Sequence, residues 1–204
     1  TIFTIAIIFI SLFCDWAILA PIFTLLFVWA RNSTFKTKMA FLISTLQEIL
    51  SKNNIMPADV DLIAINIGPG SFTGIRACTT VARVMAQQLN CKVIGVSSLE
   101  ILSKLAAKNP LVALDARKNM AYLWLDNEVK GAIPLEKVQE LVKSGDYEVI
   151  TDDKLQQLLG GKSYQQGHYP LGEILAELAG EKIKAASGNW GELLPLYIQP
   201  PPMG

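Results

Sequence analysis

Residues 61–76 read DLIAINIGPGSFTGIR, and this stretch decides the fold. Its first half is a short apolar run bounded by turn residues, which is typical of a buried strand. Its second half begins with a glycine-rich loop, Gly68 to Gly74, and a helix with apolar residues on one face follows to about Leu89. Residues 92–96 are another apolar run. A strand, a loop, a helix and a second strand in this order predict a βαβ unit with a parallel pair and a right-handed crossover.

The glycine-rich loop is the first candidate for a binding site. It leaves a predicted strand and opens a predicted helix, where backbone N–H groups can hold an anion. It lacks the Gly-Lys-Ser/Thr ending of a P-loop, and its third glycine comes one residue late for a dinucleotide fingerprint. From the residues alone, a tight turn with close backbone packing is favoured over phosphate binding.

The remaining elements follow from hydrophobic periodicity. Apolar residues at helical spacing predict helices over residues 38–50, 99–107, 135–142, 154–159 and 171–178, and short apolar runs predict strands over 111–115, 120–125 and 148–150. A boundary between two lobes is expected near Asn109-Pro110. We therefore expect a first lobe over residues 1–109 and a smaller second lobe over residues 110–204, which ends in a proline-rich tail.

Composition and charge restrict the functions open to the chain. It has 204 residues, a formal net charge of zero and a pI near 6.5. It therefore has no overall positive potential that would attract the phosphate backbone of a nucleic acid. Its three cysteines, Cys14, Cys78 and Cys91, show no C-x-x-C spacing and are expected to be buried thiols. The single histidine, His168, is expected on a surface loop. These ligands cannot assemble a zinc site of the usual kind.

Several conspicuous side chains have simple structural interpretations. Asp115 and Arg117 fit a strand-end ion pair or turn better than a catalytic carboxylate with an anion clamp. The acidic pair at residues 152–153 precedes a helical run and fits its N-cap and first turn better than a metal pair. Trp124 and Trp190 are expected as core or lobe-contact residues rather than base-stacking platforms.

Residues 1–30 are unlike the rest of the chain. They carry one charge, Asp15, in an apolar run that is long enough for a membrane helix. Asp15 in the middle of the run and Pro21 in its second half argue against such a helix. Buried strands are a second reading, since β-branched and aromatic residues are frequent here. The chain also begins with Thr rather than Met, so its true N-terminus is expected to be missing.

A family resemblance begins at the glycine-rich loop. The run Gly68-Pro69-Gly70-Ser71-Phe72-Thr73-Gly74-Ile75-Arg76 after a hydrophobic strand resembles the signature of the TsaB/YeaZ family. The likeness continues in Val96–Leu99, in Leu114–Arg117 with Tyr122, and in Leu196–Ile198, where Gln199 takes the place of a common basic residue. It covers about Phe35 to Gln199.

The resemblance implies an α/β fold of the actin/Hsp70/sugar-kinase type, in which two RNase-H-like lobes have mixed sheets flanked by helices. It implies a non-catalytic subunit, without catalytic residues or metal, that dimerises with the enzyme TsaD and supports binding of the ATPase TsaE. The complex transfers threonylcarbamoyl from its adenylate to N6 of adenosine 37 in tRNA. The family lacks the metal-binding histidine pair of TsaD, and the single histidine here agrees.

The resemblance also implies a location and a set of partners. It predicts a cytoplasmic protein with no membrane contact and no cofactor, with a nucleotide only at the interface of the complex. It predicts that tRNA is bound only through the complex, and it leaves a homodimer open for the isolated chain. The docking face is expected on the helices over residues 38–50 and 74–89, which are both amphipathic. Its predicted contact residues are Leu42, Leu46, Ile75, Cys78, Ala82 and Met85.

The N-terminal residues depart from the family pattern. A first strand ending in Asp-Thr-Ser/Thr and a hairpin are expected, and residues 1–30 contain neither, although the number of residues before the glycine loop is about right. A reading-frame slip in the gene or its sequencing is favoured over a genuine membrane anchor. Two alternatives stay open: a glycoprotease- or sugar-kinase-like enzyme of the same fold, and a membrane-anchored protein if residues 1–30 are genuine.

Overall fold

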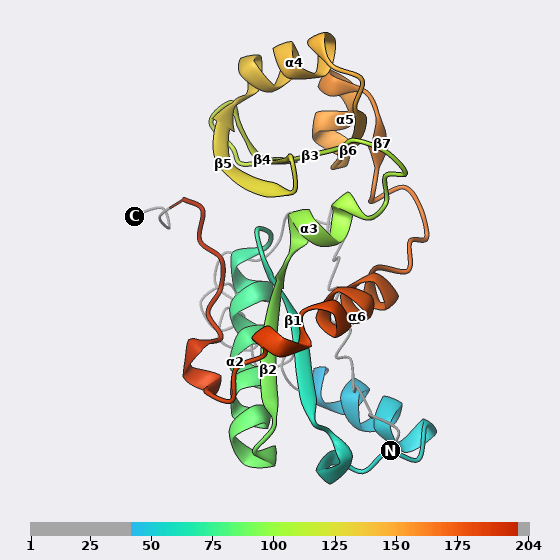
Figure 1. The fold of residues 1–204 in the computed structure, drawn as a ribbon, viewed down its shortest axis with the longest axis vertical. Coiled ribbons are helices and arrows are strands. Elements are labelled where there is room, and N and C mark those ends of the chain that lie inside the picture. Colours follow the sequence, from blue (N-terminus) through green and yellow to red (C-terminus); the bar gives the residue numbers. More distant parts are fainter. Residues whose placement is uncertain (1–41, 200–204) are drawn as a thin grey trace, which may run out of the picture.

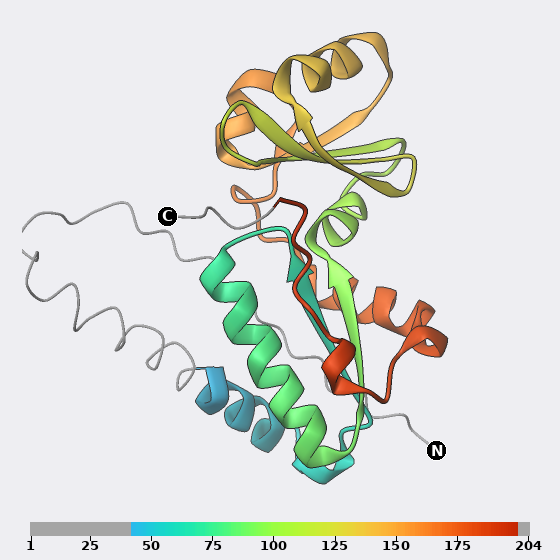
Figure 2. The same cartoon turned by 90° about the vertical axis from the view of Figure 1, so that its left-hand side faces the viewer.

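The computed structural model describes residues 42–199, and the predictions made for residues 1–30 lie outside this range. The described elements form a two-stranded sheet and, above it in Figure 1, a five-stranded sheet. Helices flank both sheets, so the predicted fold class is confirmed (Figures 1 and 2). Within the described range, no helix combines the length and the apolar character needed to cross a membrane.

The βαβ unit predicted around the glycine-rich loop is present. β1 (Leu62–Gly68) is followed by α2 (Phe72–Leu89) and β2 (Lys92–Ser97), and the two strands pair in parallel. α2 begins earlier than expected, so the last residues of the predicted loop are already helical. The physical reason is the cap, because Ser71 Oγ accepts a hydrogen bond from the Gly74 N–H at 3.4 Å.

Helices cover both faces of the β1–β2 sheet, as the uninterrupted apolar run of β1 predicts. On one face, Ile63 and Ile65 pack against α2 and the helix of residues 42–52. On the other face, Leu62 packs against α6 (Leu171–Glu181). Alternate residues of one strand therefore belong to two different apolar cores.

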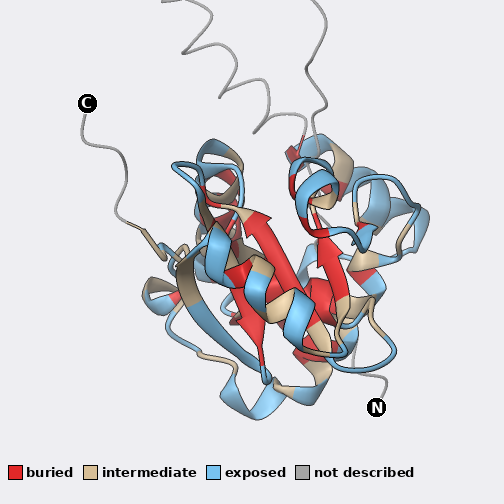
Figure 3. Cartoon of the chain, turned by 90° about the horizontal axis from the view of Figure 1, so that it is seen from above, coloured by how far each residue is buried: buried red, intermediate tan, exposed pale blue. Residues whose placement is uncertain are grey.

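The second sheet is mixed. Its strands are β3 (Pro110–Asp115), β4 (Met120–Leu125), β5 (Glu128–Pro134), β6 (Glu148–Thr151) and β7 (Lys162–Ser163), in the spatial order β5-β4-β3-β6-β7. β3 pairs antiparallel with β4 and parallel with β6. α4 (Leu135–Ser144) and α5 (Asp153–Leu159) pack on this sheet. Seen from above, buried strands lie behind helices whose outer sides are exposed (Figure 3).

Two strands, β5 and β7, are absent from the sequence-based prediction. β5 is an edge strand whose residues are exposed or half-buried, so it lacks the apolar run of the other strands. It follows β4 through Asp126 and Asn127, whose φ angles of 54° and 60° are those of a two-residue hairpin turn. This Asp-Asn pair was the available signal. β7 has only two residues, too few for any periodicity.

The predicted second lobe, residues 110–204, is not a single unit. After β7 the chain returns to the first sheet (Figure 1), where Leu175 and Leu178 of α6 join the core around Leu62. A bridge from Ser187 to Val93 of β2 continues this contact. The reason is hydrophobic: the apolar stripe of α6 covers a sheet face that would otherwise be open to water.

α3 connects the two sheets. It spans Ser98–Ser103 and ends four residues before the predicted end at residue 107. Leu99 and Leu102 of α3 pack against Val112 of β3 in a cluster that also contains Trp124. The prediction that Trp124 is a core or lobe-contact residue is therefore confirmed.

Candidate functional site

The glycine-rich loop joins the end of β1 to the start of α2. Gly68 has a φ of +104°, a conformation that favours glycine. A Cβ atom on Gly68 would lie 2.7 Å from Ile75 Cδ1, so the first turn of α2 packs directly on the loop. Among the motif residues, Gly68 and Pro69 are buried, Gly74 is half-buried, and the exposed ones are Gly70, Ser71, Phe72, Thr73 and Arg76.

Asn66 holds the start of the loop in place. Its Oδ1 accepts hydrogen bonds from the Gly68 N–H at 2.9 Å and from the Ser98 hydroxyl at 2.7 Å. Because Ser98 begins α3, one amide ties the end of β1 to the end of β2. Asn66 is a residue of the candidate site that was not predicted, although a polar residue inside an apolar strand was the available signal.

The end of the described chain runs beside the loop (Figure 2). Leu193 is buried in the core that α2 covers, and the Leu196 N–H donates a hydrogen bond to the Ile67 carbonyl at 2.8 Å. The rings of Tyr197 and Phe72 lie 5.5 Å apart between centroids, tilted by 36°. The C-terminal segment therefore forms one side of the candidate site.

Two arginines of α2 lie over aromatic rings. The Arg76 guanidinium carbon is 5.2 Å from the centre of the Phe72 ring, and that of Arg83 is 5.3 Å from the Trp190 ring. Such contacts contribute about 0.5–1 kcal/mol at exposed positions. Trp190 packs against the first core, as predicted. The surface beside the loop is therefore both aromatic and cationic.

The residues predicted for the docking face do not form a surface. Leu42, Leu46, Cys78 and Ala82 are buried, and Ile75 and Met85 are half-buried. Leu42, Leu46, Ala82 and Met85 face inward because they belong to the core between these two helices and the β1–β2 sheet. Ile75 packs on the glycine-rich loop at Gly68. The exposed residues of the same helices are the ones that a partner can reach.

The two acidic sites of the second sheet have structural roles. Asp115 Oδ1 accepts the Arg117 N–H at 3.1 Å, and its other oxygen pairs with Lys154 Nζ at 2.7 Å. This is the expected strand-end turn, with the ion pair made to lysine rather than to arginine. Asp152 caps α5, because its Oδ1 accepts the Leu155 N–H at 2.8 Å. The predicted N-cap is therefore confirmed.

The thiols and the histidine also match their predicted surroundings. Cys78 and Cys91 are free and buried, whereas Cys14 lies outside the described residues. Burial raises the pKa of the Cys78 thiol to about 11, so this thiol stays protonated at neutral pH. His168 is exposed. In the part of the chain that the structure describes, no group of three His, Cys, Asp or Glu side chains is placed to hold a metal ion.

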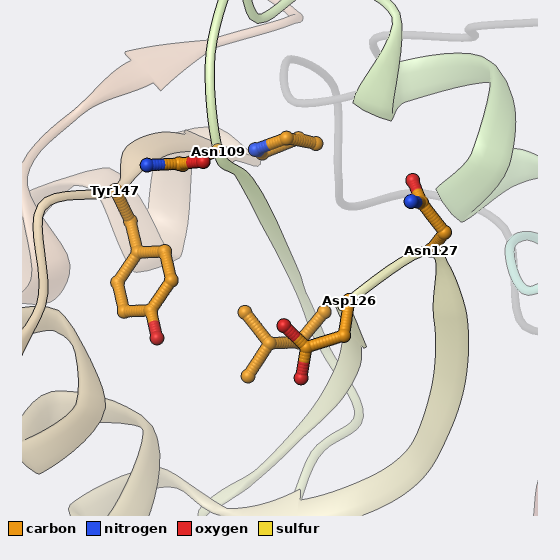
Figure 4. Close-up of a pocket in the computed structure, with 6 residues that line it drawn as sticks. Asn109, Asp126, Asn127 and Tyr147 are labelled. Carbon is orange, nitrogen blue, oxygen red and sulfur yellow. The ribbon is translucent and has the colours of Figure 1, made fainter.

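A cavity of about 350 Å³ lies on the second sheet, at the start of β3 and beside the turn from β4 to β5 (Figure 4). Its lining residues are Asn109, Pro110, Leu125, Asp126, Asn127 and Tyr147. The Asn109 amide already donates to the Asp146 carbonyl at 3.3 Å, and Asp126 pairs with Lys130 at 3.7 Å. These polar groups hold neighbouring turns together, so the glycine-rich loop stays the better candidate.

Comparison with known proteins identifies the family. The family model described as "TsaD: tRNA N6-adenosine threonylcarbamoyltransferase" matches residues 37–142, more than half of the chain. The curated "tRNA threonylcarbamoyladenosine biosynthesis protein TsaB" of Escherichia coli is 30% identical over 122 residues, 56% of this chain and 51% of that protein. The Bacillus subtilis protein of the same name is 28% identical over 163 residues, 69% of this chain and 71% of that protein. The chain belongs to the TsaB/YeaZ family.

Solved structures of TsaB/YeaZ proteins have the same fold. "YeaZ from Pseudomonas aeruginosa" superposes with a TM-score of 0.62 and 24% identity, covering 76% of this chain and 83% of that one. A structure titled as an uncharacterized protein "with similarity to peptidase YEAZ", also from Pseudomonas aeruginosa, has a TM-score of 0.62 and 23% identity, covering 78% and 82%. The chain spans about half the length of the first curated relatives that it matches.

Proposed function

We propose that this chain is a non-catalytic subunit of the complex that forms N6-threonylcarbamoyladenosine in tRNA, and that it dimerises with TsaD. The observation that carries the proposal is the run GPGSFTGIR at residues 68–76, placed between a buried parallel strand and a helix in a TsaB/YeaZ chain. Curated relatives are named as threonylcarbamoyladenosine biosynthesis proteins, which supports this assignment.

The side chains at the loop support a role without catalysis. A serine nucleophile needs an adjacent base, whereas the Ser71 hydroxyl accepts a hydrogen bond from the Gly74 N–H and caps α2. A cysteine nucleophile needs a lowered pKa, whereas burial raises the pKa of Cys78. Both groups are therefore better explained by structural roles.

The proposed docking face includes exposed apolar residues of the first helix pair. Ile43 and Ile49 on the helix of residues 42–52, and Val84 on α2, expose 45%, 40% and 53% of their surface. Apolar side chains exposed on neighbouring helices lose this contact with water when a partner helix packs on them. We propose these three residues as partner contacts in place of the six predicted ones, which are buried or half-buried.

We infer that the other partners bind through this heterodimer. TsaE is proposed to bind the pair formed with TsaD, and tRNA is proposed to bind only to the complex, because a chain of zero net charge has no field for RNA. We propose that the chain itself binds no cofactor, and that a nucleotide, if one is bound, lies at the interface with TsaD. Free buried thiols at Cys78 and Cys91 fit a reducing, cytoplasmic compartment.

Co-purification and reconstitution test the proposal. The chain and TsaD from the same organism are mixed at micromolar concentration and analysed by size-exclusion chromatography. Threonylcarbamoyladenosine in tRNA is then measured with each protein alone and with both in the presence of TsaE. We expect a complex, and modification only when both proteins are present. Failure to form a complex would overturn the proposal, and modification by this chain alone would establish an enzyme instead.

A further inference from the structure

We propose that Phe72, Arg76 and Tyr197 form one end of the TsaD-binding surface, and that a carboxylate on TsaD pairs with Arg76. The inference rests on the proposed function and adds to it the chemistry of the partner's surface. It concerns a region beyond the apolar docking face of Ile43, Ile49 and Val84, at the end of α2 that begins at the glycine-rich loop.

Val84 of the apolar docking face and the proposed end of the surface belong to one stripe on α2. Phe72, Arg76, Thr80 and Val84 follow one another at a spacing of four residues, and all four are exposed. Residues at this spacing are neighbours on a helix surface. A partner that covers Val84 and extends along α2 towards its N-terminus therefore reaches Arg76 and Phe72.

The residue types at this end are those of binding hot spots. Phe72, Tyr197 and Leu194 expose 42%, 48% and 58% of their surface, although all three are large and apolar or aromatic. Tyrosine and arginine are enriched where binding energy concentrates. The hydrogen bond from the Leu196 N–H to the Ile67 carbonyl holds the backbone of the C-terminal segment, so less backbone freedom remains to be lost on binding.

The charge of α2 indicates the chemistry of the occupant. The helix carries Arg76 and Arg83 and has no acidic residue along its length. Neither arginine forms an ion pair with a carboxylate of residues 42–199. Because the Arg76 guanidinium lies over the Phe72 ring, it can donate to a carboxylate in a bidentate pair without giving up the ring.

An RNA phosphate is the competing occupant for a guanidinium. RNA binding needs several basic groups that act together. In this chain each arginine of α2 has its own aromatic partner, and the formal net charge is zero. The surface offers one arginine beside two aromatic rings. A single carboxylate surrounded by aliphatic side chains fits this surface better than an RNA backbone with its many phosphates.

Charge reversal at Arg76, with a matched control, tests the inference. The dissociation constant for TsaD is measured by calorimetry for the parent, Arg76→Glu, Arg76→Lys and Lys137→Glu. Lys137 is an exposed lysine on α4 that forms no ion pair within the described chain. We expect about 100-fold weaker binding for Arg76→Glu, a smaller loss for Arg76→Lys, and a change below about threefold for Lys137→Glu. Circular dichroism and thermal melting check that each variant folds.

Salt dependence provides a second readout. Raising NaCl should weaken binding of the parent more steeply than binding of Arg76→Gln, because only the parent retains the charge pair. If the parent binds TsaD and a folded Arg76→Glu binds it equally well, the inference is overturned and the proposed function stands. If the parent does not bind TsaD, both are overturned. If Arg76→Glu loses only tRNA binding, RNA is the occupant and the inference is wrong.

Discussion

The backbone N–H of Leu196 donates a hydrogen bond to the carbonyl of Ile67 at 2.8 Å. This bond joins the end of the chain to the strand that leads into the glycine-rich loop. Tyr197 then reaches the ring of Phe72 at the start of α2. The conformation of the family motif therefore depends on a segment that is remote from it in the sequence.

Leu193 anchors this segment, and its truncation should be costly. It is 5% exposed and belongs to the core between α2 and the first sheet. We expect Leu193→Ala to lower the free energy of unfolding by about 2–4 kcal/mol, through lost burial and the cavity left behind. Tyr197→Ala should cost less than about 1 kcal/mol, since that ring is half exposed. Urea unfolding measures both, and equal losses would contradict the anchoring role.

A side chain at Gly68 should be costly. Its φ of +104° strains any other residue, and a Cβ atom would also lie 2.7 Å from Ile75 Cδ1. Gly131 is the matched control, because its φ is +96° and a Cβ atom there meets nothing within 4 Å. We expect Gly131→Ala to cost about 1 kcal/mol and Gly68→Ala about 1–3 kcal/mol more, measured by urea unfolding.

A second substitution identifies the source of that extra cost. Ile75→Val removes the atom that a Cβ on Gly68 would meet. In the double variant Gly68→Ala/Ile75→Val, part of the loss should therefore be recovered relative to the sum of the single variants. Simple additivity of the two changes would show that the contact with Ile75 is not the cause.

Val84 tests the apolar docking face. Val84 and Leu158 expose 53% and 52% of their surface on α2 and α5, so the same change to arginine is equally compatible with folding at both positions. We expect Val84→Arg to weaken binding of TsaD at least about tenfold, because it places a charge in an apolar contact. Leu158→Arg should bind like the parent. The affinity of both variants is measured by their binding to TsaD immobilised on a surface. Unchanged binding by Val84→Arg would place the docking face elsewhere.

Because of Cys78, the free energy of unfolding should decrease as the solution becomes alkaline. Burial raises the pKa of its thiol from 9.0 to about 11 in the folded chain. The thiol of the unfolded chain therefore ionises first, and the folded state loses stability as the pH rises from about 9 towards about 11. The parent should lose up to about 2 kcal/mol more than Cys78→Ala over this interval. Parallel pH slopes of unfolding free energy for the two proteins would contradict this.

Local patterns in the sequence were sufficient to predict several parts of the structure. The strand, the loop and the helix of residues 62–89 follow from apolar spacing and from glycines, which act within a few residues. The cap by Asp152 follows from an acidic residue directly before a helix. The same reasoning missed Asn66, since its bond to the Ser98 hydroxyl reaches a residue at the start of α3, far along the chain.

The sequence by itself determined the βαβ unit, the position of the tight loop and the amphipathic character of its helix, because periodicity and backbone preference are properties of neighbouring residues. Only the tertiary structure decided which side of each helix is free. Leu42 and Ala82 have the apolar character of a docking face, but packing on the β1–β2 sheet buries them. Tertiary structure also placed α6 on the first sheet and the C-terminal segment beside the loop. Those contacts join residues far apart in the chain. They bury apolar surface only when the backbone brings the distant segments together, and no local pattern in the sequence specifies that route.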